Sequence, residues 1–199
     1  FASMVNDYII GELLPPSQQM PLSNDVLGVK QFSNIDHVFF RGFELSYQSP
    51  KMKPLSFSFS TAFTYASIEQ TEKAVYENGE LISVELVDND ALNEIPPLES
   101  QLLAKYSFPG NLMKLSFRLR AVASQKHVSE SFNENSSPGF VLADFSLSAS
   151  LNKHIKFNAG VTNIFDKAYY EHLNRRIIGS NADYYEPGRS FFIRLSVNI

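Results

Sequence analysis

Apolar and polar side chains alternate along much of this chain, and the alternation predicts β-strands. Residues 55–65 show it most clearly: Leu, Phe and Tyr fill most of one set of alternate positions, while Ser, Ala and Thr fill the other. A period of two residues places these sets on opposite faces of a sheet. Because serine is small and hydrogen-bonds water, the second face suits a wet surface. We therefore expect a sheet with one apolar face and one solvated face.

The same pattern predicts roughly eight strands along the chain. They are expected at residues 1–10, 29–47, 55–65, 97–108, 112–129, 139–151, 155–161 and 191–199. Several reach or exceed the roughly 9–11 residues that a tilted strand needs to cross a bilayer. Residues 69–94 contain Asn78-Gly79, so we expect a long acidic loop there with short hairpin strands around this turn signal.

Long and short connections alternate between these predicted strands. The long ones are residues 11–28, 69–94, 130–138 and 165–187, and the short ones are 48–54, 109–111 and 152–154. In an antiparallel meander this order collects all the long loops at one end. Outer-membrane barrels have that layout, whereas a Greek-key sandwich does not usually show it. The predicted fold is therefore all-β, an antiparallel up-and-down transmembrane β-barrel.

Composition narrows the functional classes. The chain of 199 residues is 44% hydrophobic and 13% aromatic, with 17 Phe, 9 Tyr and no Trp, which suits strands and membrane-interface girdles. A net charge of -4 with scattered cations argues against nucleic-acid binding. The lack of cysteine excludes disulfides and thiolate metal sites and is compatible with a bacterial envelope. No apolar run is long enough for a transmembrane helix, which a membrane barrel does not need.

Four short segments resemble TonB-dependent outer-membrane receptors. The two most specific are Val161-Thr162-Asn163-Ile164-Phe165-Asp166-Lys167 followed by Tyr169-Tyr170, and Glu186-Pro187-Gly188-Arg189 leading into Phe191-Phe192. The others are Phe40-Arg41-Gly42-Phe43-Glu44-Leu45 and Ile95-Pro96-Pro97. In that family the first block closes the penultimate strand and opens the last external loop, and the second block starts the final strand. The resemblance runs from about residue 35 to the end.

The resemblance implies a larger parent protein. The family closes about 22 strands around a plug, so residues 1–199 are expected to form the C-terminal portion of such a barrel, without the plug, its TonB box or the earlier strands. Eight strands alone would leave two raw edges. Ile199 departs from the aromatic residue that commonly ends this kind of barrel.

The resemblance also implies a function and a location. The parent would lie in the bacterial outer membrane, in contact with outer-membrane lipid. Its plug would couple it to the inner-membrane TonB complex. It would take up a scarce nutrient, often a ferric siderophore or another small-molecule metal chelate, by binding and gated passage without covalent chemistry. No resident cofactor is implied.

Charged residues on the solvated face and one external loop supply the candidate site residues. The charges expected to line a wet lumen are Glu44, Glu99, Arg118, Arg120, Asp144 and Arg194. The loop residues that would contact a substrate are Tyr169, Tyr170, His172, Arg175 and Arg176. This loop segment is expected to form a short helical turn, where the arginines would pair with an anionic ferric chelate. The alternative, which we favour, is that the segment packs the loop against the rim.

No catalytic residue or metal site is predicted. No serine lies in a Gly-x-Ser-x-Gly elbow, and the four histidines show none of the usual zinc spacings. Two other functions stay open. One is a small closed eight-stranded outer-membrane barrel for adhesion or anchoring, which an upstream plug would exclude. The other is a soluble all-β binding domain, which dependence on detergent would exclude.

Overall fold

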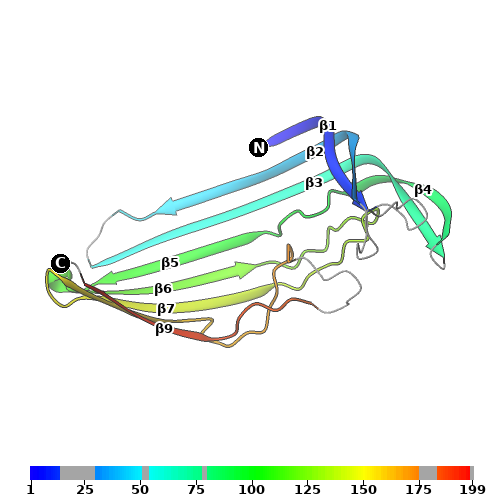
Figure 1. Ribbon diagram of the computed structural model, residues 1–199. Coiled ribbons are helices and arrows are strands. Elements are labelled where there is room, and N and C mark those ends of the chain that lie inside the picture. The colour runs from blue at the N-terminus through cyan, green and yellow to red at the C-terminus, as the bar shows by residue number, and fades with distance from the viewer. Residues whose placement is uncertain (14–29, 51–53, 78–79, 175–182, 198–199) are drawn as a thin grey trace.

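The computed structural model describes residues 1–13, 30–50, 54–77, 80–174 and 183–197. These residues form one antiparallel sheet of nine strands (Figure 1). Eight strands follow one another as neighbours in the order β1-β2-β3-β5-β6-β7-β8-β9, while β4 pairs only with β3. The predicted all-β antiparallel meander is confirmed. Among the described residues, no helix has the length and apolarity to cross a membrane.

The strand bounds follow the alternating pattern closely. They are β1 Ala2–Leu13, β2 Lys30–Gln48, β3 Leu55–Glu77, β4 Glu80–Ala91, β5 Glu99–Ser107, β6 Met113–Val122, β7 Phe140–Ser150, β8 Ile155–Thr162 and β9 Ser190–Val197. The strand expected at 112–129 is shorter than predicted, because the chain leaves the ladder after Val122 and returns only through the isolated bridge between Gln125 and Ser137.

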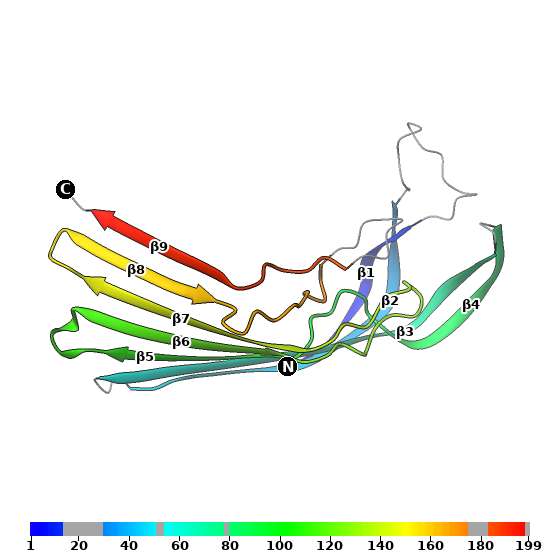
Figure 2. The same cartoon turned by 90° about the horizontal axis from the view of Figure 1, so that it is seen from below.

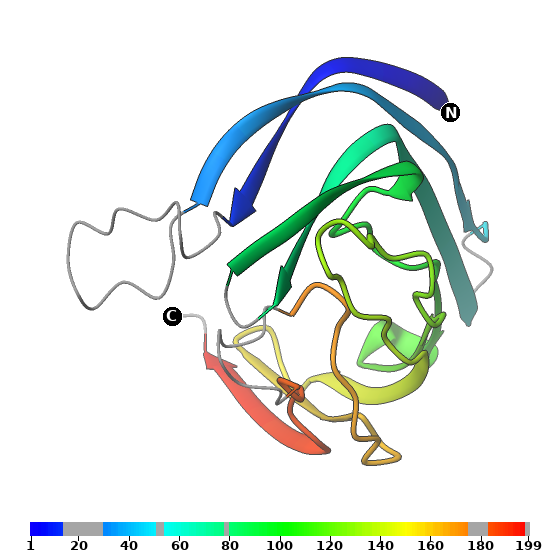
Figure 3. The same ribbon diagram turned by 90° about the vertical axis from the view of Figure 1, so that its right-hand side faces the viewer.

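The register assigns each side chain to one of two faces, since directly opposed residues project to the same side. Phe43 faces Phe63 and Phe117 faces Phe145 on the outer face, where large apolar side chains remain exposed. Ser46 faces Ser60 on the inner face. Figure 3 shows the sheet curving around this inner side, and the connection after β8 folds into the curve. The expected division into an apolar and a polar face is therefore present.

Residues 69–94 differ from the expected loop. β3 continues to Glu77, and β4 pairs with it from Ala91 opposite Ser67 to Glu80 opposite Glu77. β3 pairs with β5 only as far as Ala62 opposite Glu99 and with β2 only as far as Ile68 opposite Val38, so its distal end leaves the wall together with β4 (Figure 2). The hairpin strands expected around Asn78-Gly79 are therefore present, but they are much longer than predicted and replace most of the expected acidic loop.

The buried core lies at the end of the sheet that carries the long connections. Its main cluster joins β1, β2, β3 and the chain after β4 through Ile10, Ile35, Val38, Ala66, Ile68, Leu92 and Ile95. A smaller cluster contains Val122, Phe140 and Leu142, with Tyr169 packed against it. The short turns lie at the opposite end (Figure 1). The packed apolar groups therefore fix the connections, while the wall is held mainly by its strand ladder.

Phe192 is an apolar exception on the inner face. It lies opposite Gly160 of β8, and a Cβ added at Gly160 would lie 2.7 Å from the Phe192 ring and 2.6 Å from the Phe145 carbonyl oxygen. Glycine at this position thus lets an aromatic ring and a neighbouring backbone approach the strand closely.

Candidate binding site on the inner face

A cavity of about 790 Å³ opens on the inner face near the long connections. Four strands form its wall through Glu44, Ser60, Gln101 and Arg120, and residues 171–174 of the β8–β9 connection cover it. Alternation places these wall side chains on one side of the sheet. The cavity is thus bounded by rigid strands on one side and by a loop on the other.

Arg120 links the wall to the covering loop. It donates to both carboxylate oxygens of Glu99 on β5, at 2.9 and 2.7 Å. It also donates to both oxygens of Glu171 in the loop, at 2.5 and 3.2 Å. Such bidentate, charge-assisted hydrogen bonds are the stronger kind. One guanidinium therefore fixes the position of the loop above the cavity.

A second link joins His172 to the β6–β7 connection. The His172 side chain is only 3% exposed; its Nε2 lies 3.2 Å from Glu134 Oε1 and its Nδ1 lies 3.0 Å from Ser137 Oγ. Glu134 also accepts hydrogen bonds from the backbone N–H groups of Glu94 and Ser129. Burial opposes ionisation of Glu134, but these hydrogen bonds outweigh it and hold the pKa of its carboxyl below the ordinary value.

Asp90 ties the β3–β4 hairpin to the same connection. Its carboxylate accepts from the Ser129 hydroxyl at 2.6 Å and from the backbone N–H groups of Glu130 and Ser131 at 2.9 and 3.0 Å. Burial again raises the pKa of this carboxyl, and the hydrogen bonds lower it further than burial raises it. Two connections far apart in sequence are therefore joined by one buried carboxylate.

The two motif blocks near the end of the chain contact each other. Asn163, at φ 50°, bonds through its side chain to the backbone N–H and carbonyl of Lys167, and its own N–H donates to Asp144 Oδ1 at 2.9 Å. Asp166 of the first block accepts the backbone N–H of Arg189 of the second at 2.8 Å. These motif residues shape the start and the end of the β8–β9 connection.

The predicted loop residues that the structure describes pack against their neighbours. Tyr169 stacks at a tilt on Phe140, with ring centroids 4.5 Å apart, and Tyr170 meets Tyr185 edge-on at 5.6 Å. The His172 side chain is buried, and the expected helical turn is instead a hydrogen-bonded turn from Glu171 to Asn174 with no helix among the described residues of the loop. Arg175 and Arg176 lie outside the described residues. Rim packing, the favoured alternative, agrees with these contacts.

The predicted inward charges share one face of the sheet by register, and two pairs form. Arg120 binds Glu99, and Arg118 Nε lies 3.1 Å from Asp144 Oδ2. Glu44 lines the same cavity as Glu99, whereas Arg194 lies opposite Asn158 on β8, outside it.

Two carboxylates of the site were not predicted. Glu171 stands beside the predicted loop residues. Glu134 gave no sequence signal, because its partner His172 is 38 positions away. No group of three or more potential metal-ligating side chains converges anywhere in the described ranges.

Comparison with known proteins identifies the family. A family model described as TonB dependent receptor-like, beta-barrel, matches residues 5–164. This chain belongs to the TonB-dependent receptor family. A search of curated proteins returned no match.

Several solved structures share the TonB-dependent receptor fold. Copper transporter OprC superposes with a TM-score of 0.77 at 22% identity, covering 98% of this chain and 28% of that chain. The FrpB iron transporter from Neisseria meningitidis, F3-3 variant, gives 0.63 at 16% identity, with coverages of 98% and 28%. The siderophore receptor PiuA from Acinetobacter baumannii gives 0.59 at 15% identity, with coverages of 83% and 22%. The chain thus spans less than a third of the length of these relatives.

Proposed function

We propose that this chain is the C-terminal portion of the β-barrel of an outer-membrane receptor for TonB-dependent uptake of a ferric siderophore or another metal chelate. The observation that carries the proposal is the family match over residues 5–164, on a sheet with an apolar outer face and a polar inner face. Relatives of this fold are described as a copper transporter, an iron transporter and a siderophore receptor. The plug and the contact with the TonB complex belong to the same proposal and lie outside this chain.

In this proposal the strands form a wall and the connections control access, without covalent chemistry. The cavity lining carries Glu44, Glu99 and Glu171 against one guanidinium, that of Arg120. This balance disfavours an anionic chelate inside the cavity itself. The proposed contacts to such a chelate are therefore in the external loop, at Tyr169, Tyr170, His172, Arg175 and Arg176.

Uptake by cells tests the function directly. The receptor would be expressed at its full native length, and the accumulation of radiolabelled ferric chelates would be compared in cells with and without a functional TonB complex. We expect accumulation of at least one chelate only when the complex is present. Accumulation that does not depend on the complex, or no accumulation over a broad chelate panel, would contradict the proposal.

The mass of the protein isolated from membranes in detergent tests the architecture. A plugged receptor must weigh several times the 22.4 kDa of this chain. A mass near that of the chain would instead favour a small adhesion or anchoring barrel. That alternative has less support, because β1 pairs only with β2 and β9 only with β8 in the described sheet, leaving it open.

A further inference from the structure

Arg41 is a charged exception on the apolar outer face. It lies opposite Ala2 on β1 and Tyr65 on β3, between Phe39 and Phe43 along β2. The arginines of the other wall strands, Arg118, Arg120 and Arg194, lie on the inner face. A cation on the lipid-facing side of a barrel is unfavourable, and more so the deeper it lies. Its presence there therefore calls for a stabilising partner.

The Arg41 guanidinium is stacked but carries no hydrogen bond or ion pair within the described part of the chain. Its Cζ lies 4.2 Å from the centroid of the Tyr65 ring, and the His127 ring also stacks on Tyr65 at 4.2 Å. Stacking occupies the flat face of a guanidinium and leaves the N–H groups at its edge available to an acceptor.

Two other polar side chains on the outer face, Thr61 and Ser100, are satisfied internally. The Ser100 hydroxyl donates to Thr61 Oγ1 at 2.8 Å, and the Thr61 hydroxyl donates to the Glu99 carbonyl oxygen at 3.0 Å. These two residues therefore need no partner from the surroundings. Arg41 differs from them in presenting a planar set of donors outward.

A groove of about 650 Å³ surrounds Arg41 on this face. Met4 and Phe39 contribute apolar surface, with 54% and 42% of their area exposed, and Ser67 and Asn89 contribute polar groups. We call it the Arg41 groove, lined by Met4, Phe39, Arg41, Tyr65, Ser67 and Asn89. An apolar wall beside an outward guanidinium matches a ligand with an anionic head and a hydrocarbon tail.

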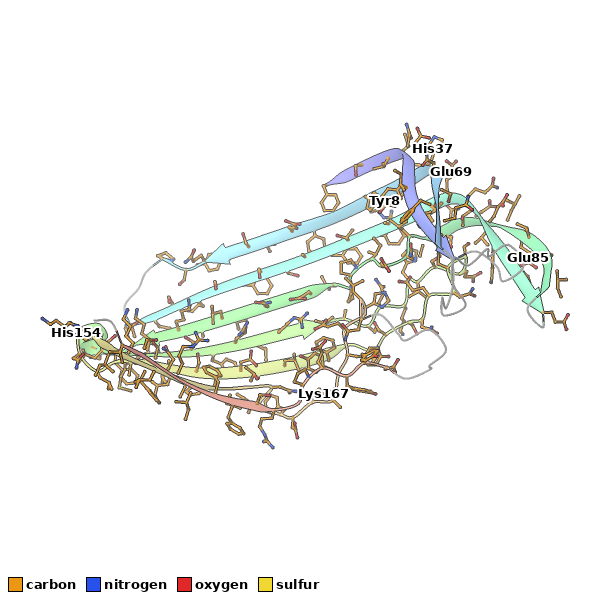
Figure 4. The ribbon with its side chains drawn as sticks, in the orientation of Figure 1. Tyr8, His37, Glu69, Glu85, His154 and Lys167 are labelled. Atoms are coloured by element: carbon orange, nitrogen blue, oxygen red, sulfur yellow. The ribbon has the colours of Figure 1, made fainter. Side chains whose placement is uncertain are left out.

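The groove lies at the level where the apolar band ends. Beyond Phe39 and Ser67, four positions from Arg41 and Tyr65, stand His37 and Glu69, an exposed pair 3.6 Å apart at the end with the long connections (Figure 4). His154 marks the opposite end, at a short turn. In the other direction Phe43, Leu45 and Tyr47 continue the apolar face. Arg41 and Tyr65 are thus at the boundary where aromatic girdles and lipid headgroups meet.

We propose that the Arg41 groove binds the phosphate headgroup of a lipid in the leaflet facing the long connections. The N–H groups at the edge of the Arg41 guanidinium donate to the phosphate oxygens. The Tyr65 ring, stacked on the flat face of the guanidinium, sets its orientation. An acyl chain of the lipid packs on Met4 and Phe39. Arginine matches this task because its planar fork pairs bidentately with phosphate. This inference rests on the proposed function only for the membrane location of the wall.

Native mass spectrometry of the full-length receptor in detergent tests the site with defined lipids. The probe is phosphatidic acid, compared with phosphatidylcholine and with inorganic phosphate alone. We expect the receptor to retain phosphatidic acid selectively, and Arg41→Gln to weaken that retention about tenfold. Arg41→Lys, which keeps the charge but loses the planar fork, should give an intermediate value.

The controls separate a headgroup site from general charge and from misfolding. Lys167→Gln removes one positive charge from the exposed β8–β9 connection and should leave retention unchanged. Each variant must keep the heat-modifiable migration of a folded barrel. Equal retention by Arg41→Gln and the unaltered receptor, or equal retention of both lipids, overturns the proposal, and displacement of lipid by inorganic phosphate points to a free-phosphate site instead. Because this readout is independent of uptake, a failure of the transport proposal would be seen separately.

Discussion

Arg120 occupies the point where wall and loop meet. Its guanidinium satisfies Glu99 on one side and Glu171 on the other, while its Cζ lies 5.4 Å from the Phe140 ring centroid. Three charged side chains of a half-buried cluster therefore depend on one another. Removing one partner leaves the other charged groups partly desolvated and without a hydrogen-bond partner, which costs more free energy than the intact interaction contributes.

Arg120→Gln is expected to loosen the covering loop. Loss of the charge-assisted hydrogen bonds should make docking of the loop less favourable by about 1–3 kcal/mol. Limited proteolysis and hydrogen exchange should show residues 169–174 opening more often, with the wall strands unaffected. Lys114→Gln, on the same strand and face but outside the cavity, is the matched control. Unchanged exchange in the loop of the Arg120 variant would contradict the assigned role.

Gly160→Ala is expected to destabilise the β7–β8–β9 part of the sheet. The added methyl group meets the Phe145 carbonyl oxygen and the Phe192 ring at distances well below contact, so strand or ring must shift. Overpacking of this kind typically lowers the free energy of unfolding by about 1–3 kcal/mol. The midpoint of denaturant-induced unfolding measures it. Ser146→Ala, at the position opposite Gly160 on β7, should change the midpoint little.

At the scale of elements, the connections are held together by carboxylates. Asp90 joins the hairpin to the β6–β7 connection, and Glu134 joins that connection to His172. Both carboxyls have pKa values below the ordinary ones because hydrogen bonds outweigh burial. Their ionised forms are therefore part of what keeps the loops closed over the inner face.

Acid should release the Glu134 contact. A carboxyl with a lowered folded-state pKa contributes stability that is complete above its unfolded value and is lost as pH falls through the folded value. For Glu134 the ordinary value is 4.5, so docking of residues 171–174 should weaken below that pH. Hydrogen exchange of this segment between neutral and acidic pH reports it. In Glu134→Gln the docking should be weaker at neutral pH, and the step due to this carboxyl should vanish.

The strands could be predicted at this scale, but the contacts among connections could not. Each wall strand has its own period-two alternation, so the faces of residues such as Phe57 and Ser58 can be assigned from the neighbouring sequence alone. The link between His172 and Glu134 joins positions 38 apart and follows no period. The β3–β4 hairpin was expected only as short strands around Asn78-Gly79, because Ile82, Val84 and Leu86 alternate but are exposed among acidic residues that suggested a loop.

At the scale of the whole molecule, the sheet is a curved wall with two free edges. Its outer face presents Phe43, Leu45, Phe191 and Leu195 to the surroundings, all more than half exposed. Its core clusters lie only at the end with the long connections. Such a wall needs further strands paired to its two edges and an apolar environment against its outer face. Two features of the sequence predicted such a wall. The apolar positions alternate too regularly for loops, and the inner face carries too many charged residues for a dry core.

Residues 1–199 expressed alone are expected not to yield a folded monomer. The edges at β1 and β9 would remain unpaired, so the polypeptide should aggregate without detergent and lack heat-modifiable migration with it. The full-length receptor, refolded in parallel, should show that migration. A soluble, monodisperse 199-residue protein with a cooperative unfolding transition would rule out the membrane-wall interpretation and favour a soluble binding domain.

Among the described residues, the β3–β4 hairpin extends well beyond the end of the wall (Figure 2). Its strands meet at Glu77 and Glu80 after ten register pairs, and the eight pairs beyond Ile68 involve no other strand of the described sheet (Figure 2). On a bacterial surface this would be the part that antibodies and phages meet first. It is also the place where an epitope tag would disturb the ladder least. A surface label there would report the orientation of the receptor in living cells before its cargo is known.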